Sequence, residues 1–149
     1  MIEFKVSGFV ELENALRKLP EAVAGAFLEQ SLREAGQQMA ESARRFAPRS
    51  DSTRQGGHMA DSIAIRKIKN DTTRGLEATS WVGPDRKHFY GMFAEFGTVH
   101  ETARPFLRPA FESEKGATID RLGRSLWTRI EREARKHERK SRGAPLKRP

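Results

Sequence analysis

The chain has 149 residues, enough for one domain with a modest hydrophobic core, and it contains no cysteine. The lack of cysteine excludes disulfide scaffolds, thiolate zinc sites, iron–sulfur ligation and cysteine nucleophiles. Basic residues outnumber acidic ones by 28 to 20, and residues 129–149 alone hold nine basic and three acidic side chains. We therefore predict a nearly balanced domain with a cationic tail, rather than a basic DNA-binding surface on the domain itself.

Membrane and secretory classes receive no support from the sequence. No apolar run approaches the roughly 18–20 residues that a membrane-spanning helix needs. The opening residues MIEFK lack the basic and then apolar order of a secretory signal. We expect a soluble protein that stays in the cytoplasm.

The N-terminal half predicts a strand and two helices. Alternation in residues 2–10 indicates a short strand, and Leu12, Leu16 and Leu19 predict a helix over 11–19 that Pro20 ends. A long helix over 21–46 follows, and its apolar positions step by three and four residues. These positions are Val23, Phe27, Leu28, Leu32, Ala35, Met39, Ala43 and Phe46.

The middle of the chain predicts a β-hairpin. Residues 49–57 are polar and rich in turn formers, which indicates a loop. Residues 62–69 and 76–82 each alternate like a half-buried strand, and the turn residues of 70–75 join them. Trp81 lies on the face of its strand opposite to the alternating apolar residues. We therefore expect both faces of the hairpin to be covered, by a helix or by a neighbouring subunit.

The C-terminal half predicts a short aromatic helix over 87–96, ended by Gly97, and a final helix over about 110–135. Pro105 and Pro109 bracket a segment that we expect to be extended. The apolar stripe of the final helix stops after Ile130. We predict one α+β domain over 1–130, in which two long helices pack on a small antiparallel sheet. A basic helical extension and a disordered tail would form residues 131–149.

No constellation typical of catalysis is present. The sequence has neither a nucleophile elbow nor a glycine-rich phosphate loop. Asp85 with His88, and His100 with Glu101, come nearest to a metal or acid–base pair, but solvated or structural histidines explain them better. We therefore predict that the protein is not an enzyme and binds no metal or cofactor.

The aromatic helix has apolar side chains on nearly every side. Phe89, Tyr90, Met92, Phe93 and Phe96 lie within eight residues. One face of a small domain cannot cover all of them. We expect a second copy or another partner to shield part of this cluster.

Three blocks occur in order along the chain. Residues 47–63 run from Ala-Pro through Gly57 and Met59 to Ser62-Ile63, residues 90–98 read YGMFAEFGT, and residues 103–110 read ARPFLRPA. Together with residues 8–12, they resemble the HK97 gp10-like family of tailed-bacteriophage neck and tail-completion proteins. The resemblance covers about residues 8–130. In the first block, Gly56 and Met59 depart from the family pattern, which has Thr and Leu there.

The resemblance implies a non-enzymatic structural protein of the virion, made in the host cytoplasm and placed at the neck. It would act in head–tail joining by forming a homo-oligomeric ring with head-closure, portal and tail-terminator proteins. The expected subunit and partner interface comprises Phe89, Tyr90, Phe93, Phe96, Arg104, Phe106, Leu107 and Arg108. The segment 105–108 would be a rigid arm that docks on a neighbour or, equally, packs against the helices of its own chain.

A second hypothesis is a small basic nucleic-acid-binding protein that uses its C-terminal tail. The candidate contacts are Arg135, Lys136, Arg139, Lys140 and Arg142. The tail has no aromatic residue after Glu131, so any contact would be electrostatic and independent of base sequence. The two hypotheses combine if the tail faces DNA in a neck channel.

Overall fold

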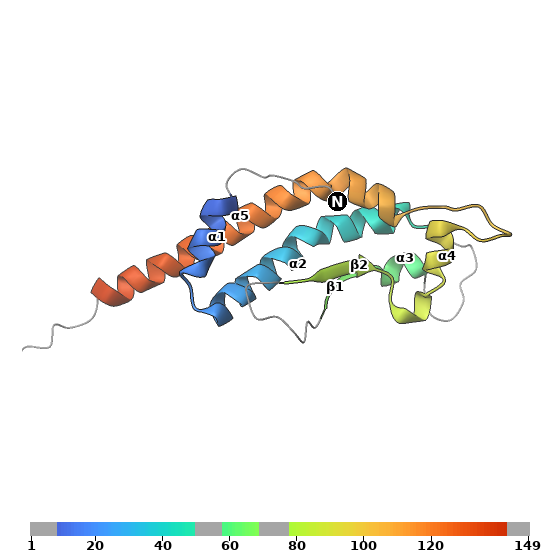
Figure 1. The fold of residues 1–149 in the computed structure, drawn as a ribbon. Coiled ribbons are helices and arrows are strands. Elements are labelled where there is room, and N and C mark those ends of the chain that lie inside the picture. Colours follow the sequence, from blue (N-terminus) through green and yellow to red (C-terminus); the bar gives the residue numbers. More distant parts are fainter. Residues whose placement is uncertain (1–8, 50–57, 69–77, 143–149) are drawn as a thin grey trace, which may run out of the picture.

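The computed structural model describes residues 9–49, 58–68 and 78–142. In chain order the elements are α1 Phe9–Arg17, α2 Glu21–Phe46, α3 Met59–Ser62, β1 Ala64–Lys67, β2 Ser80–Gly83, the 3₁₀ helix η1 Arg86–His88, α4 Gly91–Phe96 and α5 Leu107–Arg142. The predicted α+β class is confirmed, because the long helices pack on a two-stranded antiparallel sheet (Figure 1).

Helix α2 is the central layer, with α5 on one side and the hairpin on the other (Figure 1). The two long helices run antiparallel. Near one end of the pair, Ser42 Oγ donates to Glu114 Oε1 at 3.0 Å. Toward the other end, Ser125 Oγ lies 3.1 Å from Ser31 Oγ and 2.6 Å from Glu34 Oε2.

The buried face of α2 is made of small residues rather than large ones. The buried positions are Ala24, Ser31, Ala35, Gly36, Ala40, Ser42 and Ala43. Of the predicted stripe, only Ala35 and Ala43 are buried, and Phe46 is half exposed. The five other positions of the stripe are partly buried, and Phe27 and Leu28 pack against a core cluster. The predicted stripe therefore faces the core with Phe46 as its exception, while small residues take the fully buried positions because a helix covered on two sides needs them where its neighbours approach closely.

Two hydrophobic clusters lie at opposite ends of the α2–α5 pair. One, around Phe106, joins the ends of α2 and α5 to α3, and its buried members are Ala43, Ala47, Met59, Ala60, Ile63, Phe106 and Ala110. The other holds α1 against both long helices through Leu12, Leu16, Ala24, Leu126 and Ile130. The burial of Leu12 and Leu16 confirms the periodicity predicted for the first helix.

The hairpin pairs Ile65 with Val82 and Arg66 with Trp81. It lies so close to α2 that a Cβ on Gly36 would come within 2.4 Å of the Ile65 side chain. Trp81 is half exposed, and the Arg66 guanidinium lies 5.1 Å from the centroid of its ring. Among the described residues, no helix covers this face of the sheet as predicted.

Several element boundaries differ from the predictions. Residues 9 and 10, placed in an N-terminal strand, begin α1; residues 1–8 lie outside the described part of the chain. Ser62 ends α3 instead of starting a strand, because its Oγ donates to Met59 O at 2.8 Å. The aromatic segment forms η1 and then α4 rather than one helix, since Asp85 caps η1 through its side chain.

Helix α5 continues without a break past Ile130 to Arg142, and its last turns extend beyond α1 and α2 (Figure 1). Its 36 residues correspond to a length of about 54 Å. The helical extension predicted after residue 130 is present, while residues 143–149 lie outside the described part of the chain. In the described residues, no helix is long and apolar enough to cross a membrane.

Leu126→Ala should lower the free energy of unfolding by about 2–5 kcal/mol, because the 2% exposed side chain joins α5 to α1 and α2. Urea denaturation followed by circular dichroism measures this loss. Thr128→Ala, on the exposed side of the same turn, is the control and should change stability by only about 0.5 kcal/mol. Equal losses in the two variants would contradict the assignment of Leu126 to this cluster.

Candidate interaction surface

Two residues of α4 face the interior of the protein, and their positions determine which side chains of this helix are exposed. Gly91 and Glu95, one turn apart, are the buried positions of this helix. A Cβ on Gly91 would lie 2.6 Å from Met59 Sδ and 3.1 Å from Pro84 Cγ, so no larger residue fits there without movement. With these two positions turned inward, the large apolar side chains between and beside them face solvent.

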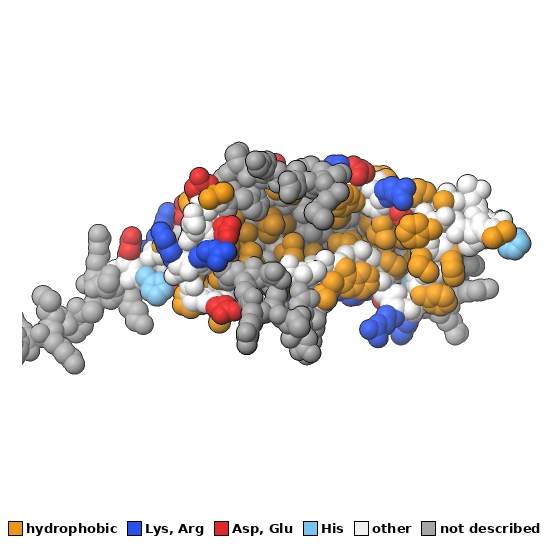
Figure 2. Space-filling model, viewed as in Figure 1, with side chains coloured by type: hydrophobic (Ala, Val, Ile, Leu, Met, Phe, Trp, Pro, Cys, Tyr) orange, Lys and Arg blue, Asp and Glu red, His pale blue; other side chains and the backbone are white. Residues whose placement is uncertain are grey.

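The exposed apolar side chains form what we call the aromatic surface. Its members and their exposed fractions are Phe89 67%, Tyr90 46%, Met92 56%, Phe93 44%, Phe96 69% and Val99 97%. Figure 2 shows hydrophobic side chains gathered over the end of the molecule that holds η1 and α4. The ring of Phe89 makes edge-to-face contacts with Tyr90 and Phe93 at 6.4 and 6.3 Å between centroids.

A groove of about 380 Å³ lies within this surface. Its apolar walls come from β2, η1, α4 and the start of α5, and include Trp81, Pro84, Phe89, Met92, Phe96 and Leu107. Arg86 and Asp85 supply charge at its edge. An exposed apolar groove with few polar groups is suited to receive apolar side chains of another protein.

Glu95 caps the N-terminus of α5 with its carboxylate. Oε2 accepts hydrogen bonds from the backbone N–H groups of Phe106 at 2.7 Å and Leu107 at 2.8 Å, and Oε1 accepts from Arg108 at 3.0 Å. Pro109 has no N–H, and the N–H of Ala110 donates to Phe106 O. Every backbone donor of the first turn is thus satisfied or absent, which is why a helix begins here.

The same contacts control the ionisation of Glu95. Burial alone would raise its pKa, but the hydrogen bonds from the three backbone N–H groups, with a contribution from the charge of Arg108, outweigh it. The pKa of the Glu95 carboxyl is therefore below its ordinary value of 4.5. A carboxylate at a helix N-terminus also interacts favourably with the helix dipole.

The loop between α4 and α5 is fixed at both ends. Gly97 ends α4 with φ of 77°, and a Cβ there would lie 2.8 Å from the backbone nitrogen of Ala103. The N–H of Arg104 donates to Ala94 O at 2.7 Å, and Thr98 Oγ1 accepts from the N–H groups of His100 and Glu101. Glycine is thus the only residue type that this position accommodates without strain.

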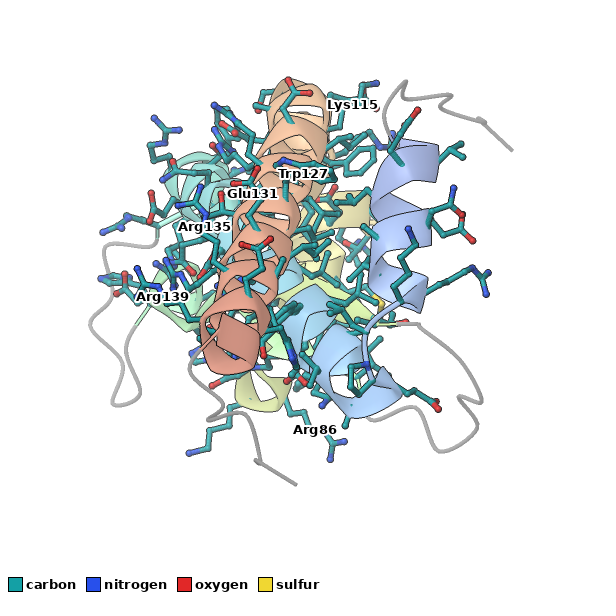
Figure 3. All side chains as sticks on the ribbon, turned by 90° about the vertical axis from the view of Figure 1, so that its left-hand side faces the viewer. Arg86, Lys115, Trp127, Glu131, Arg135 and Arg139 are labelled. Atoms are coloured by element: carbon teal, nitrogen blue, oxygen red, sulfur yellow. The ribbon has the colours of Figure 1, made fainter. Side chains whose placement is uncertain are left out.

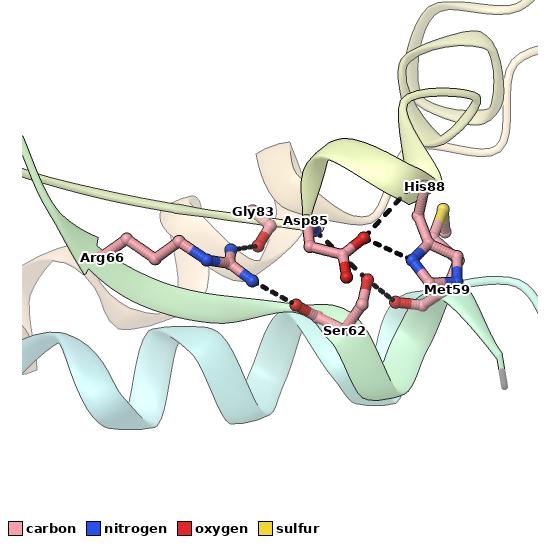
Figure 4. Close-up of polar contacts among 6 residues, drawn as sticks. All are labelled: Met59, Ser62, Arg66, Gly83, Asp85 and His88. Atoms are coloured by element: carbon pink, nitrogen blue, oxygen red, sulfur yellow. Dashed lines mark hydrogen bonds and ion pairs between the residues drawn. The ribbon is translucent and has the colours of Figure 1, made fainter. Parts of the chain in front are cut away.

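A second polar network holds η1 against the hairpin (Figure 4). Asp85 Oδ1 accepts from the His88 N–H at 3.1 Å and lies 2.5 Å from His88 Nδ1. The side-chain hydrogen bond from His88 is the main reason that the pKa of Asp85 is lowered. Arg66 donates to Gly83 O at 2.8 Å and to Ser62 O at 3.0 Å. These contacts explain His88 as a structural histidine.

The interface residues predicted from sequence fall into two groups. Phe89, Tyr90, Phe93 and Phe96 are exposed together, and Arg104 and Arg108 are also exposed. Phe106, by contrast, has no exposed surface, because it fills the cluster between α2, α3 and α5. The extended conformation predicted for this segment is wrong, since Leu107 already belongs to α5. Of the two placements expected for the segment, Phe106 takes the one that packs against its own chain.

Comparison of the sequence with known protein families places the chain in one of them. The sequence pattern of the family described as "Bacteriophage HK97-gp10, putative tail-component" matches residues 11–97. The chain belongs to this gp10-like family. The match runs from α1 to Gly97, so the ARPFLRPA block and α5 lie beyond it. No curated protein and no solved structure shows significant similarity to the chain.

Family membership indicates a structural component of a phage. In the described part of this gp10-like protein, no group of three or more His, Asp or Glu side chains could hold a metal ion. His100 lies exposed in the loop after α4, far along the chain from the Asp85–His88 pair and not joined to it by any described contact.

Sequence reasoning missed Glu95 as the residue that organises the site. The signal was its place between Phe93 and Phe96, where a charged side chain in an otherwise apolar helix would need a partner. Its partners are backbone groups eleven to thirteen residues later in the chain, and no side-chain pattern marks them. Trp81 and Met92, which line the groove, were also left out of the predicted interface.

Glu95→Gln should lower the free energy of unfolding at pH 7 by about 1.5–3 kcal/mol, because the amide NH₂ replaces one accepting oxygen with a donor. The folded-state pKa of Glu95 is depressed, so its contribution is present above the unfolded value of 4.5 and is lost as pH falls through the folded pKa. The stability gap between wild type and variant should therefore be constant from neutral pH down to about 5 and shrink below 4.5. Exposed Glu101→Gln is the control, and a gap independent of pH would contradict the capping role.

Two glycine substitutions should act in opposite directions. Gly97→Ala should cost about 1 kcal/mol or more, because it places a Cβ against backbone at positive φ. Gly116→Ala, within α5 and with no atom near the added methyl, should stabilise the protein by up to about 1 kcal/mol. Thermal unfolding of the two variants tests both, and a stabilised Gly97→Ala would rule out the described turn.

Proposed function

We propose that this gp10-like protein joins the head and tail of a tailed phage by assembling as a homo-oligomeric ring at the virion neck. The single observation that supports this most strongly is the aromatic surface, where six large apolar side chains are between 44% and 97% exposed. Apolar surface of this extent on a small protein is typical of an interaction site.

The energy available from covering this surface is sufficient for assembly. Full burial of a side chain such as Phe contributes about 1.5–3 kcal/mol, and several such side chains lie side by side here. Part of this gain is lost to the entropy of association, which is why several anchors are needed. Rigid support of η1 by Asp85 and of α4 by Glu95 lowers that cost, because the rings are already positioned.

A ring requires contact between two different surfaces of the same chain, so that each copy binds the next. In this proposal, the groove within the aromatic surface is one of the two, and it receives apolar side chains from a different surface of the neighbouring subunit. The exposed guanidinium groups of Arg104 and Arg108 lie at the rim, where they can pair with carboxylates of a neighbour or of a head-closure or tail-terminator protein.

The double substitution Phe89→Ser and Phe96→Ser should weaken self-association at least about tenfold, since it removes the two most exposed rings. Light scattering at increasing micromolar concentrations, with and without purified portal and tail, measures the assembled mass. Both side chains point to solvent, so circular dichroism should remain unchanged.

The matched control is Val10→Ser with Trp127→Ser, which removes two exposed apolar side chains from α1 and α5. It should assemble as the wild type does. A wild-type protein that stays monomeric under all of these conditions, or a control that fails to assemble as the aromatic variant does, would overturn the proposal.

A further inference from the structure

Basic side chains form a continuous stripe along α5, on a side of the helix that the core does not use. Arg124, Arg132, Arg135, Lys136 and Arg139, which we call the basic face, recur at intervals of three, four or eight residues around Thr128. Residues spaced in this way lie on one side of an α-helix. Figure 3 shows Arg135 and Arg139 projecting to the same side of α5, away from α1.

The basic face begins on the body of the protein. Two adjoining shallow hollows share Thr128 and Arg132; Arg124 lines one of them, and Arg135, Lys136 and Arg139 line the other. Each hollow also has one carboxylate in its lining, Glu34 in the first, where it pairs with Arg129, and Glu131 in the second, so basic side chains outnumber acidic ones in both. The sequence alone placed the excess charge in a tail after residue 129. The structure instead joins the tail to Arg124 in one straight helix, so the charges are held in a fixed relation.

Most of this charge is not neutralised within the chain. Among the described residues, Arg132, Arg135 and Arg139 make no ion pair, whereas Lys136 pairs with Glu133. Other arginines of α5 are paired, since Arg121 binds Glu114 and Arg129 binds Glu34. The three arginines are thus available to a ligand.

The fold does not require the end of this helix. The last buried apolar residue of α5 is Ile130, and residues 131–139 are exposed except for the half-buried Glu133. Unpaired arginines on one side of an exposed helix repel each other weakly, and a bound anion relieves that repulsion. The charge of this helix end, rather than any role in the core, therefore points to a polyanionic ligand.

We propose that the basic face binds the phosphate backbone of duplex DNA without regard to base sequence. Protein interfaces place apolar or aromatic anchors at their centre, and this face has none. Membrane-surface helices need a bulky apolar face, which α5 lacks after Ile130. Single strands are held by stacking on several aromatic side chains, whereas the one exposed aromatic residue beside the basic face is Trp127, and no aromatic residue follows it in α5.

The dimensions of the face agree with a duplex. Arg124 and Arg139 are about 22 Å apart along the helix axis, at 1.5 Å per residue. Duplex DNA presents one phosphate charge for about every 1.7 Å of its axis, so phosphates are not limiting over this length. With one phosphate for each arginine of the face, we expect about four phosphate contacts. The inference does not depend on ring assembly, because one copy of the chain presents the whole face.

The test uses the full chain and a fluorescent duplex of random sequence, with binding followed by anisotropy between about 50 and 200 mM salt. The wild type should bind with a slope of log affinity against log salt near −4, as expected for about four phosphate contacts. Arg132→Gln, Arg135→Gln and Arg139→Gln together should lower affinity at low salt at least about tenfold and make the slope shallower by about 3.

The control variant removes the same number of positive charges from exposed positions outside the basic face, through Lys18→Gln, Arg33→Gln and Lys87→Gln. Its affinity should stay within about threefold of wild type. Equal losses in both triple variants, or no binding by the wild type, would overturn the proposal. Binding to poly-glutamate, to phosphatidylserine vesicles or to a single strand as tight as to the duplex would overturn it as well.

Discussion

The carboxylate of Glu95 determines how the end of the protein that carries the aromatic surface is built. It ties α4 to the first turn of α5 through three backbone hydrogen bonds, and it occupies one of the two inward positions on a helix of six residues. Gly91 occupies the other, under Met59 and Pro84. With both inward positions taken, Met92, Phe93 and Phe96 are left largely exposed. The aromatic surface is thus a geometric result of the cap, and not a failure of the core to bury these rings.

The long helices separate two surfaces of different chemistry. The small residues that line α2 let the hairpin and α5 approach it from opposite sides, and the two hydrophobic clusters secure its ends. The apolar aromatic surface lies near the N-terminus of α5, and the basic face lies toward its C-terminus. One continuous helix therefore sets the distance between a surface suited to protein contacts and a surface suited to phosphates. In a phage tail component, protein and DNA contacts could then be made at fixed separation by the same subunit.

Strong local signals were sufficient to predict much of the fold. Leu12 and Leu16 at helical spacing, Pro20, the alternation around Ile65 and Val82, and the family blocks gave the α+β class and the order of its elements. The side of α2 that faces the core was predictable, but its fully buried positions were not, because large side chains dominate a sequence pattern while Ala, Ser and Gly occupy those positions. The aromatic surface was predictable from crowding of rings in one segment. The role of Glu95 and the burial of Phe106 depend on backbone groups that only the folded chain brings together.

The loop from Gly97 to Pro105 is pinned where it leaves α4 and where it returns to Ala94. The side chains at its tip face solvent: Val99 is 97% exposed, and in the described part of the chain the hydrogen bond of His100 is the one from its backbone N–H to Thr98 Oγ1. Substitutions at the tip can therefore alter what the molecule touches without disturbing how it folds. The anchored ends thus fix the course of the loop, while the side chains at its tip contribute to the exposed surface without contributing to the core.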